Sequence, residues 1–199
     1  GRLTPEKNVH QLLAAFKSVD TDLQLAIVGD DPFNRDYVAN LKRIRDPRVR
    51  FLGYVYGDDG LHLLAIAYLY ATASGLEGTS PALLTAMGQG CCALVNGIAE
   101  HRETLGEAGR PYVENDVADL RRQLQFLLDR PDVVRTTAGR RDCGRSRCTT
   151  GTRSRTRWRR STRGWRPECP TALRPAVRLE THSQEDFPEA CIAGRQSGV

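Results

Sequence analysis

The feature that most constrains the fold is the alternation of short apolar runs with helix-period segments over residues 1–139. Apolar runs typical of buried strands occupy 23–28, 49–52, 68–72, 92–95 and 112–113. Amphipathic patterns predict helices over 8–19, 35–44, 57–67, 81–88, 99–105, 116–128 and 132–140. Strands separated by helices form a parallel sheet that helices cover on both faces. The sequence therefore predicts an α/β fold with a doubly wound parallel sheet.

In such a sheet, ligands bind outside the carboxyl ends of the strands, so the loops 29–34, 53–57, 73–81 and 96–99 are the candidates. The loop 73–81 is the most informative, because it carries Glu77 and Gly78 and leads into a helix at Pro81. A helix N-terminus offers N–H groups to a diphosphate, and glycine lets a ligand approach the backbone. Glu77 could accept hydrogen bonds from sugar hydroxyls. An ordinary capped loop has the same composition, so both interpretations stay open.

The first eight residues, GRLTPEKN, place two cations ahead of the first helix. Arg2 as a planar fork and Lys7 as a point charge suit the oxygens of a pyrophosphate. A solvated surface loop is the alternative interpretation.

The location of the charges excludes several classes of function. The net charge of +5 arises in the last 60 residues, because residues 1–139 hold 15 basic and 18 acidic side chains. A basic groove across the main fold is therefore excluded. No run approaches the ~20 apolar residues of a membrane helix. The six cysteines do not form a secreted disulfide framework, which favours a cytoplasmic protein.

Residues 140–166 contain eleven arginines and one acid, without periodicity, so we expect disorder there. Arginine outnumbers lysine 26 to 3 in the chain, which indicates GC-rich coding DNA and makes out-of-frame translation one explanation of this tail. A solvated tail without a role and an RNA- or lipid-binding arm are the others. We thus divide the chain into a domain over 1–141 and an Arg-rich tail over 142–199.

Four segments in order carry a family resemblance: GRLTPEKN, LAIVGDDP, VRFLGYV and EGTSPALLTAMGQGCCALVNGIAEHRETLGEAG. Together they resemble the carboxy-terminal, nucleotide-sugar-binding domain of the retaining GT-B glycosyltransferases (group 1, family 4 type). The resemblance implies a Rossmann-like half of a GT-B fold. It also implies hexosyl transfer from a UDP-, GDP- or similar nucleotide sugar to a carbohydrate or lipid-linked acceptor, with retention of configuration, in cell-envelope polysaccharide biosynthesis.

Carried over by position, the resemblance implies roles for particular residues. Arg2 and Lys7 would neutralise the diphosphate leaving group, and Glu77 would lie beside the donor sugar; these three form the catalytic set. The donor-binding set comprises Gly1, Gly29, Asp30, Leu52, Gly53, Tyr54, Gly78, Thr79, Ser80, Leu84 and Thr85. The resemblance implies no metal or cofactor, since the two cations would serve the diphosphate, and no nucleic-acid partner. It places the protein in the cytoplasm, either free or peripherally bound at the inner face of the membrane.

Two departures from the family pattern matter. Thr85 stands where the family has a second acid that binds the ribose diol, and a neutral hydroxyl would weaken donor binding by roughly tenfold. The chain also begins at the loop that would follow the first strand of the domain, so we expect that strand and the acceptor-binding amino-terminal domain to be missing, and the truncated chain to have little activity. The competing hypotheses are a decayed fragment that at most binds nucleotide and, ranked last, an RNA-binding protein that acts through its tail.

The remaining reactive side chains have structural interpretations. His10, His62 and His101 lie on expected helices, where a histidine is more often part of a surface or core than catalytic. Cys91 and Cys92 are adjacent in an apolar run and have no recognisable base partner, so we expect them to be small buried residues.

Overall fold

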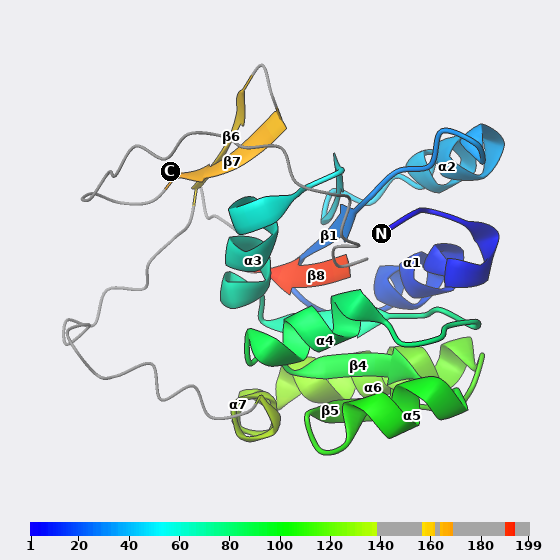
Figure 1. The fold of residues 1–199 in the computed structure, drawn as a ribbon, viewed down its shortest axis with the longest axis vertical. Helices are drawn as coiled ribbons and strands as arrows, with labels where there is room; N and C mark the ends of the chain where they lie inside the picture. The colour runs from blue at the N-terminus through cyan, green and yellow to red at the C-terminus, as the bar shows by residue number, and fades with distance from the viewer. Residues whose placement is uncertain (139–156, 162–163, 169–189, 194–199) are drawn as a thin grey trace.

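The computed structural model describes residues 1–138, 157–161, 164–168 and 190–193 (Figure 1). Its helices are the 3-10 turn η1 (Pro5–Lys7), α1 (Val9–Lys17), α2 (Arg35–Lys42), α3 (Gly57–Ile66), α4 (Pro81–Gly88), α5 (Ala99–Leu105), α6 (Val117–Asp129) and α7 (Pro131–Thr137). Its strands are β1 (Gln24–Val28), β2 (Val49–Gly53), β3 (Leu69–Thr72), β4 (Ala93–Asn96), β5 (Gly109–Tyr112), β6 (Arg157–Ser161), β7 (Gly164–Glu168) and β8 (Ala190–Ala193).

The main sheet has six strands in the order β2-β1-β8-β3-β4-β5. The pairs β1 with β2, β3 with β4, and β4 with β5 are parallel, and helices lie on both sides of the sheet (Figure 1). This confirms the predicted α/β fold. β8 is antiparallel to both of its neighbours, β1 and β3, while β6 and β7 form a separate two-stranded sheet.

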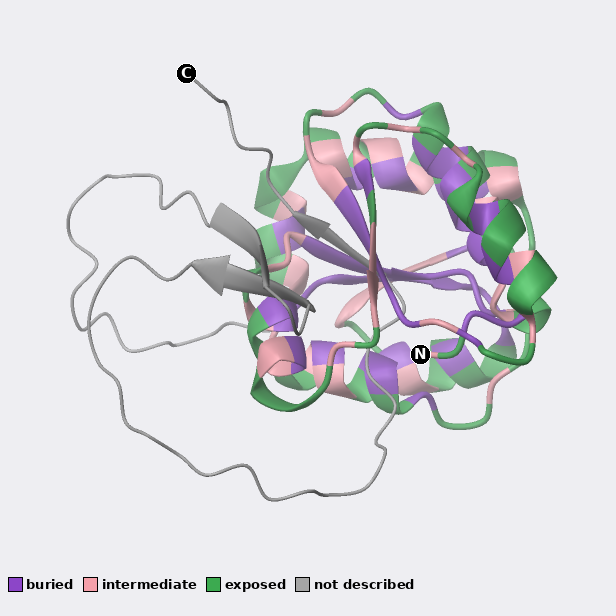
Figure 2. Ribbon diagram, turned by 90° about the horizontal axis from the view of Figure 1, so that it is seen from above, coloured by how far each residue is buried: buried purple, intermediate pink, exposed green. Residues whose placement is uncertain are grey.

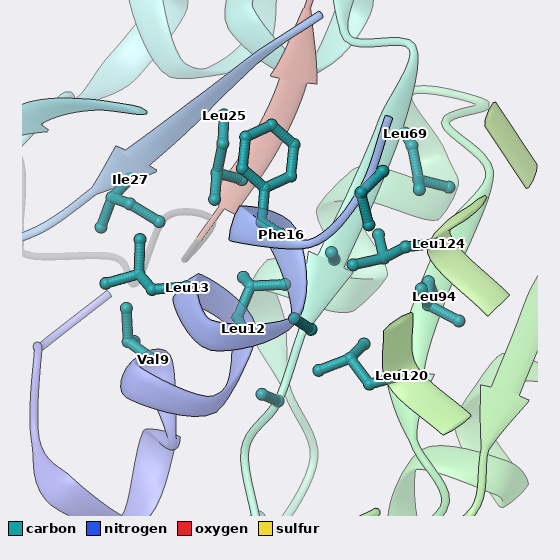
Figure 3. Packing of buried hydrophobic residues seen from close by; sticks show 14 of the residues in the cluster. Val9, Leu12, Leu13, Phe16, Leu25, Ile27, Leu69, Leu94, Leu120 and Leu124 are labelled. Atoms are coloured by element: carbon teal, nitrogen blue, oxygen red, sulfur yellow. The ribbon is translucent and has the colours of Figure 1, made fainter. Parts of the chain in front are cut away.

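Alternating side chains of the strands divide the interior into two cores, one on each face of the sheet. In β1, Leu25 and Ile27 belong to the first core, whereas Ala26 and Val28 belong to the second. The first core gathers buried residues of α1, α2, α6 and α7, as Figure 3 shows for the α1 and α6 side chains. The second gathers residues of α3, α4 and α5. Buried residues therefore follow the sheet and the inner helix faces (Figure 2).

Most predicted elements are confirmed, with ends that differ by one or two residues. The fifth strand is the exception, because it covers Gly109–Tyr112 rather than 112–113. Arg110 and Pro111 hid it, since proline and arginine carry little strand signal. β5 is an edge strand, where a proline is tolerated because one side of the strand needs no hydrogen-bond donor.

Two further expectations differ from the structure at the end of the domain. The last helix ends at Thr137 rather than at 140. The segment 142–199, which we expect to be a disordered tail, contains β6, β7 and β8, and its other residues lie outside the described ones. Asn8 occupies the N-cap position of α1, but it has left-handed backbone angles and its side chain makes no capping bond.

Candidate functional site

Residues 1–8 lie against the carboxyl ends of β1 and β3. The amino group of Gly1 donates to Val28 O at 3.0 Å, and Gly75 N donates to Glu6 O at 2.9 Å. Gly29, directly after β1, has a φ of +132°, and a Cβ atom there would lie 1.7 Å from Gly1 O. Only glycine fits such a position. The amino-terminal loop is thus built into the edge of the sheet where ligands of parallel α/β folds bind.

Lys7 and Glu77 form an ion pair between this loop and the loop that follows β3. The two residues are 70 positions apart in the sequence, and their side chains are 21% and 10% exposed. Of the three predicted catalytic residues, the structure therefore brings these two into direct contact. A lysine ammonium carries three N–H donors, so Lys7 can hold the Glu77 carboxylate and still donate to an anion beside it.

Arg2 lies on the same edge with an exposed side chain, and no described contact joins it to Glu77. Its charge helps to lower the pKa of two carboxylates. The pKa of Asp31 is lowered mainly by a hydrogen bond from the Asn34 side chain, and that of Glu6 by hydrogen bonds from its backbone and from Thr4. Arg2 is thus the smallest contributor to both shifts, and lies between the loop after β1 and the turn η1.

The loop 77–81, which leads into α4, presents backbone amides at the carboxyl end of β3. Ser80 caps α4, and its Oγ accepts from Leu83 N at 3.4 Å, while Pro81 has no N–H. Within the described part of the chain, no group accepts from the amides of Gly78 and Thr79, and a Cβ at Gly78 would meet open space. Loop amides therefore lie beside the capped N-terminus of α4, where the sequence predicts a diphosphate.

Thr85 and Leu84 lie on the first turns of α4. The Thr85 hydroxyl donates to Pro81 O at 2.8 Å, so toward a ligand it can act only as an acceptor. Leu84 is 47% exposed, which leaves an apolar side chain beside it for a ligand to cover.

An open pocket of about 450 Å³ lies between the loop after β1, the helix α2 and Tyr54, which follows β2. Its lining includes Asp30, which pairs with Lys42 at 3.0 Å, and Tyr54, whose hydroxyl donates to Asp30 O at 2.7 Å. Gly29 N donates to Gly53 O at 2.8 Å and joins the two strand ends. Four of the predicted nucleotide residues, Gly29, Asp30, Gly53 and Tyr54, are therefore joined by hydrogen bonds between the two loops, whereas the side chain of Leu52 packs against the second core. Two further lining residues are helix side chains of α2, Arg35 and Lys42, and the sequence analysis missed both.

A buried polar cluster beside the site was also missed, and Asn96 lies at its centre. This residue ends β4 with no exposed surface, and its side chain bonds to Asn115 and to the backbone after β3. His101 Nδ1 lies 3.0 Å from Asn96 O, and the ring is 1% exposed, which confirms its structural interpretation. The one possible sequence signal was Asn115, because an asparagine directly before a helix cap often adopts left-handed backbone angles.

The other reactive side chains behave as expected. Cys91 and Cys92 are buried and not in a disulfide, and burial raises the pKa of Cys92 to about 11. His10 lies on the surface of α1 against the Tyr37 hydroxyl, at 3.0 Å.

Among the helices of the described residues, none combines the length and the apolar character needed to cross a membrane.

The match to a family profile decides the affiliation. The family described as "Glycosyl transferases group 1" matches residues 1–130. The chain belongs to this family. It is 28% identical over 123 residues to the O-antigen chain mannosyltransferase B of Escherichia coli, covering 59% of this chain and 32% of that protein.

Solved glycosyltransferase structures share the fold. The HepE protein of Anabaena, in complex with UDP, matches with a TM-score of 0.63 at 25% identity, over 69% of this chain and 40% of its own. Sucrose-phosphate synthase from Thermosynechococcus elongatus matches with a TM-score of 0.62 at 24% identity, over 70% and 37%. The chain thus spans well under half the length of these relatives and corresponds to one Rossmann-like half of a GT-B fold.

Proposed function

We propose that this chain is the donor-binding half of a retaining hexosyltransferase and holds a nucleotide diphosphate sugar at the edge formed by residues 1–8 and the loops after β1, β2 and β3. The observation that carries the proposal is the Lys7–Glu77 ion pair, because it joins a cation suited to phosphate and a carboxylate suited to sugar hydroxyls at that edge. The Anabaena protein, which was crystallised with UDP and with UDP and glucose, has the same fold.

In the proposed complex, the nucleoside, the diphosphate and the sugar of the donor each contact a different part of this edge. The nucleoside lies at the pocket beside Tyr54, with Thr85 accepting from the ribose. The diphosphate lies between Arg2, Lys7 and the amides of Gly78 and Thr79. When the bond between the anomeric carbon and the phosphate oxygen breaks, negative charge develops on the diphosphate, and fixed cations stabilise it more than they stabilise the intact donor.

Glu77 holds the sugar by accepting hydrogen bonds from its hydroxyls. The acceptor, a carbohydrate or lipid-linked hydroxyl compound, attacks from the side that the second half of a GT-B enzyme covers. Activity of the whole enzyme therefore depends on that second half, whereas donor binding is a property of this chain.

Calorimetric titration of the full chain with UDP, GDP and UMP tests the proposal. Lys7→Met and Arg2→Met remove a charge at the site, and Lys17→Met removes one at the far end of α1 as a matched control. We expect the first two to weaken nucleoside diphosphate binding by about tenfold or more, because a hydrogen bond to a charged group is worth ~1.5–3 kcal/mol. UMP binding should fall less, and Lys17→Met should change nothing beyond twofold.

Two outcomes would contradict the proposal. Binding of neither UDP nor GDP at millimolar concentration would favour the decayed fragment. Equal losses in the Lys7 and Lys17 variants would show that general charge, rather than the site, attracts the nucleotide.

A further inference from the structure

We infer that Asn96 and Asn115 are positioning residues that hold the loop 73–77, and with it Glu77, against the amino-terminal loop. This deepens the proposed function and rests on it for the role of Glu77. Neither asparagine touches the ion pair, so they act through the backbone that carries it.

The Asn96 side chain reaches from the end of β4 to the backbone that follows β3. Its Nδ2 donates to Ser74 O at 3.0 Å and lies 3.4 Å from Ala73 O. A buried carbonyl without a partner costs about 1–3 kcal/mol, so these two carbonyls are held where the amide group of Asn96 can reach them. Asn96 is completely buried, and the His101 ring holds its carbonyl oxygen from the other side.

Asn115 fixes the orientation of the Asn96 amide group. Asn115 N donates to Asn96 Oδ1 at 2.9 Å, and Asn115 Oδ1 accepts from Asn96 Nδ2 at 3.0 Å. The two bonds match the donor and the acceptor of the amide, so the group cannot flip without losing both. Asn115 can turn its amide and its side chain toward Asn96 because it has left-handed backbone angles, with φ 56°.

The held loop then meets the amino-terminal loop at Gly75. Gly75 N donates to Glu6 O, next to Lys7, and a Cβ at position 75 would lie 2.9 Å from Asn8 Nδ2 and 3.4 Å from Asn115 Oδ1. Gly75 is therefore enclosed by the amino-terminal loop on one side and by Asn115 on the other. A loop clamped at 73, 74 and 75 leaves residue 77 little freedom, which places the Glu77 carboxylate within reach of Lys7.

Asn115→Gly is the decisive variant, because glycine adopts left-handed angles freely and keeps the N–H that donates to Asn96 Oδ1. It removes the Asn115 side chain, and with it the oxygen that accepts from Asn96 Nδ2, while the backbone N–H stays. Asn115→Asp restores an oxygen at that position and serves as the rescue. Gln125→Ala removes comparable hydrogen bonds, to Asp20, at the far end of α6 and controls for a general loss of stability.

The first measurement is hydrogen exchange at the Gly75 amide, which reports whether the loop stays on Glu6 and needs no ligand. The Tyr70 amide, bonded to Cys92 O in the sheet, reports global opening. We expect Asn115→Gly to speed exchange at Gly75 at least tenfold relative to Tyr70, and Asn115→Asp and Gln125→Ala to leave this ratio within about twofold of the wild type.

The second measurement compares the affinities for UDP and UDP-glucose, and for GDP and GDP-mannose. Glu77 is proposed to contact the sugar, so a displaced loop should lower affinity for the nucleotide sugar at least fivefold more than affinity for the nucleotide alone. Asn115→Asp should restore this difference.

The two proposals fail in different ways. If the wild type binds no nucleotide, the proposed function fails, while the exchange at Gly75 still decides whether the asparagines hold the loop. If nucleotide binding depends on Lys7 but Asn115→Gly leaves the relative exchange at Gly75 unchanged, the positioning role is overturned and the function stands. If Asn115→Gly speeds exchange at Gly75 but binds nucleotide sugars as tightly as the wild type, the asparagines hold the loop without positioning Glu77. That result also overturns the inference.

Discussion

Arg48 joins α1 to β2, and its removal should destabilise the fold more than any exposed charge would. Its Nη1 donates to Val19 O at 2.7 Å, and Nη2 donates to Asp46 Oδ2 at 2.8 Å. The guanidinium also lies 4.9 Å from the centre of the Phe16 ring. Its Nη2 also donates to Lys17 O, the last carbonyl of α1, at 3.3 Å, so the arginine binds carbonyls at the end of the helix and just beyond it.

The magnitude follows from what Arg48→Met leaves behind. The Asp46 side chain is only 9% exposed, so its carboxylate would lose its cation in a poorly solvated place. Breaking a pair of this kind costs about 3 kcal/mol, because the abandoned charge and the unpaired carbonyls add to the lost attraction. For a domain of this size, we expect the melting temperature to fall by roughly 10 °C.

The pH dependence gives the sign of the effect. The hydrogen bond from Arg48 lowers the pKa of Asp46 below its ordinary 3.8 in the folded state. A lowered folded-state pKa stabilises the protein above the unfolded value, and this contribution is lost as the pH falls through the folded pKa. Wild type should therefore exceed Asp46→Asn in stability at pH 5–7, and the difference should shrink as the pH falls from 3.8 through the lowered pKa of the folded state.

Urea unfolding followed by circular dichroism, from pH 2.5 to 7, measures both effects. Arg50→Met is the control, since Arg50 is an exposed arginine on β2, two residues after Arg48. A loss below 1 kcal/mol for Arg48→Met, or a gap between wild type and Asp46→Asn that widens on acidification, would refute the reasoning.

Three further predictions follow from buried groups. Tyr112→Phe should raise the free energy of unfolding by about 1 kcal/mol in urea titrations, because the Tyr112 hydroxyl is buried without a partner among the described residues; destabilisation would reveal one. Cys92 should resist iodoacetamide at pH 8 in the native state and react only after unfolding, as mass spectrometry of its peptide would show, because burial raises its pKa to about 11. Gly29→Ala should cost at least 2 kcal/mol and displace Gly1 from Val28, observable as a changed Gly1 environment by NMR; a neutral result would mean that the amino-terminal loop moves freely.

The sequence predicted the fold because its helices and strands obey the hydrophobic period. β1 contains a continuous run of four apolar residues, all of them buried, and in α6 the buried positions recur with the spacing of a helix, so each element could be found locally. β5 could not, since its four residues include Arg110 and Pro111 and its pairing with β4 is a property of the sheet. β8 was not predicted either, because its place between β1 and β3 depends on contacts distant in sequence.

The site was predictable to the extent that topology brings strand ends together. Glu77 could be assigned to this edge because it lies in the loop after a predicted strand, whereas Lys7 was assigned to the same site through the family resemblance. Their direct contact could not be predicted, since it depends on how residues 1–8 pack. The role of Asn96 could not be predicted from the sequence for a different reason. A lone asparagine at the end of a buried strand has no periodic signal, and only its bonds show that it holds the next loop.

In the proposed diphosphate site, the Lys7–Glu77 ion pair would have two opposite effects on phosphate binding. A lysine that awaits an anion must be oriented, yet an isolated ammonium on a flexible stem samples many rotamers and loses about 2 kcal/mol of entropy when it is fixed. Glu77 orients Lys7 in advance, so part of that entropy is already lost before any ligand binds. The Glu77 carboxylate would also repel a phosphate, and this repulsion would limit how closely the proposed diphosphate could approach. Glu77→Gln separates the two effects, since it keeps a hydrogen-bond acceptor for Lys7 and for sugar hydroxyls but removes the charge. If orientation dominates, this variant binds UDP more weakly than the wild type does, and if repulsion dominates, it binds UDP more tightly.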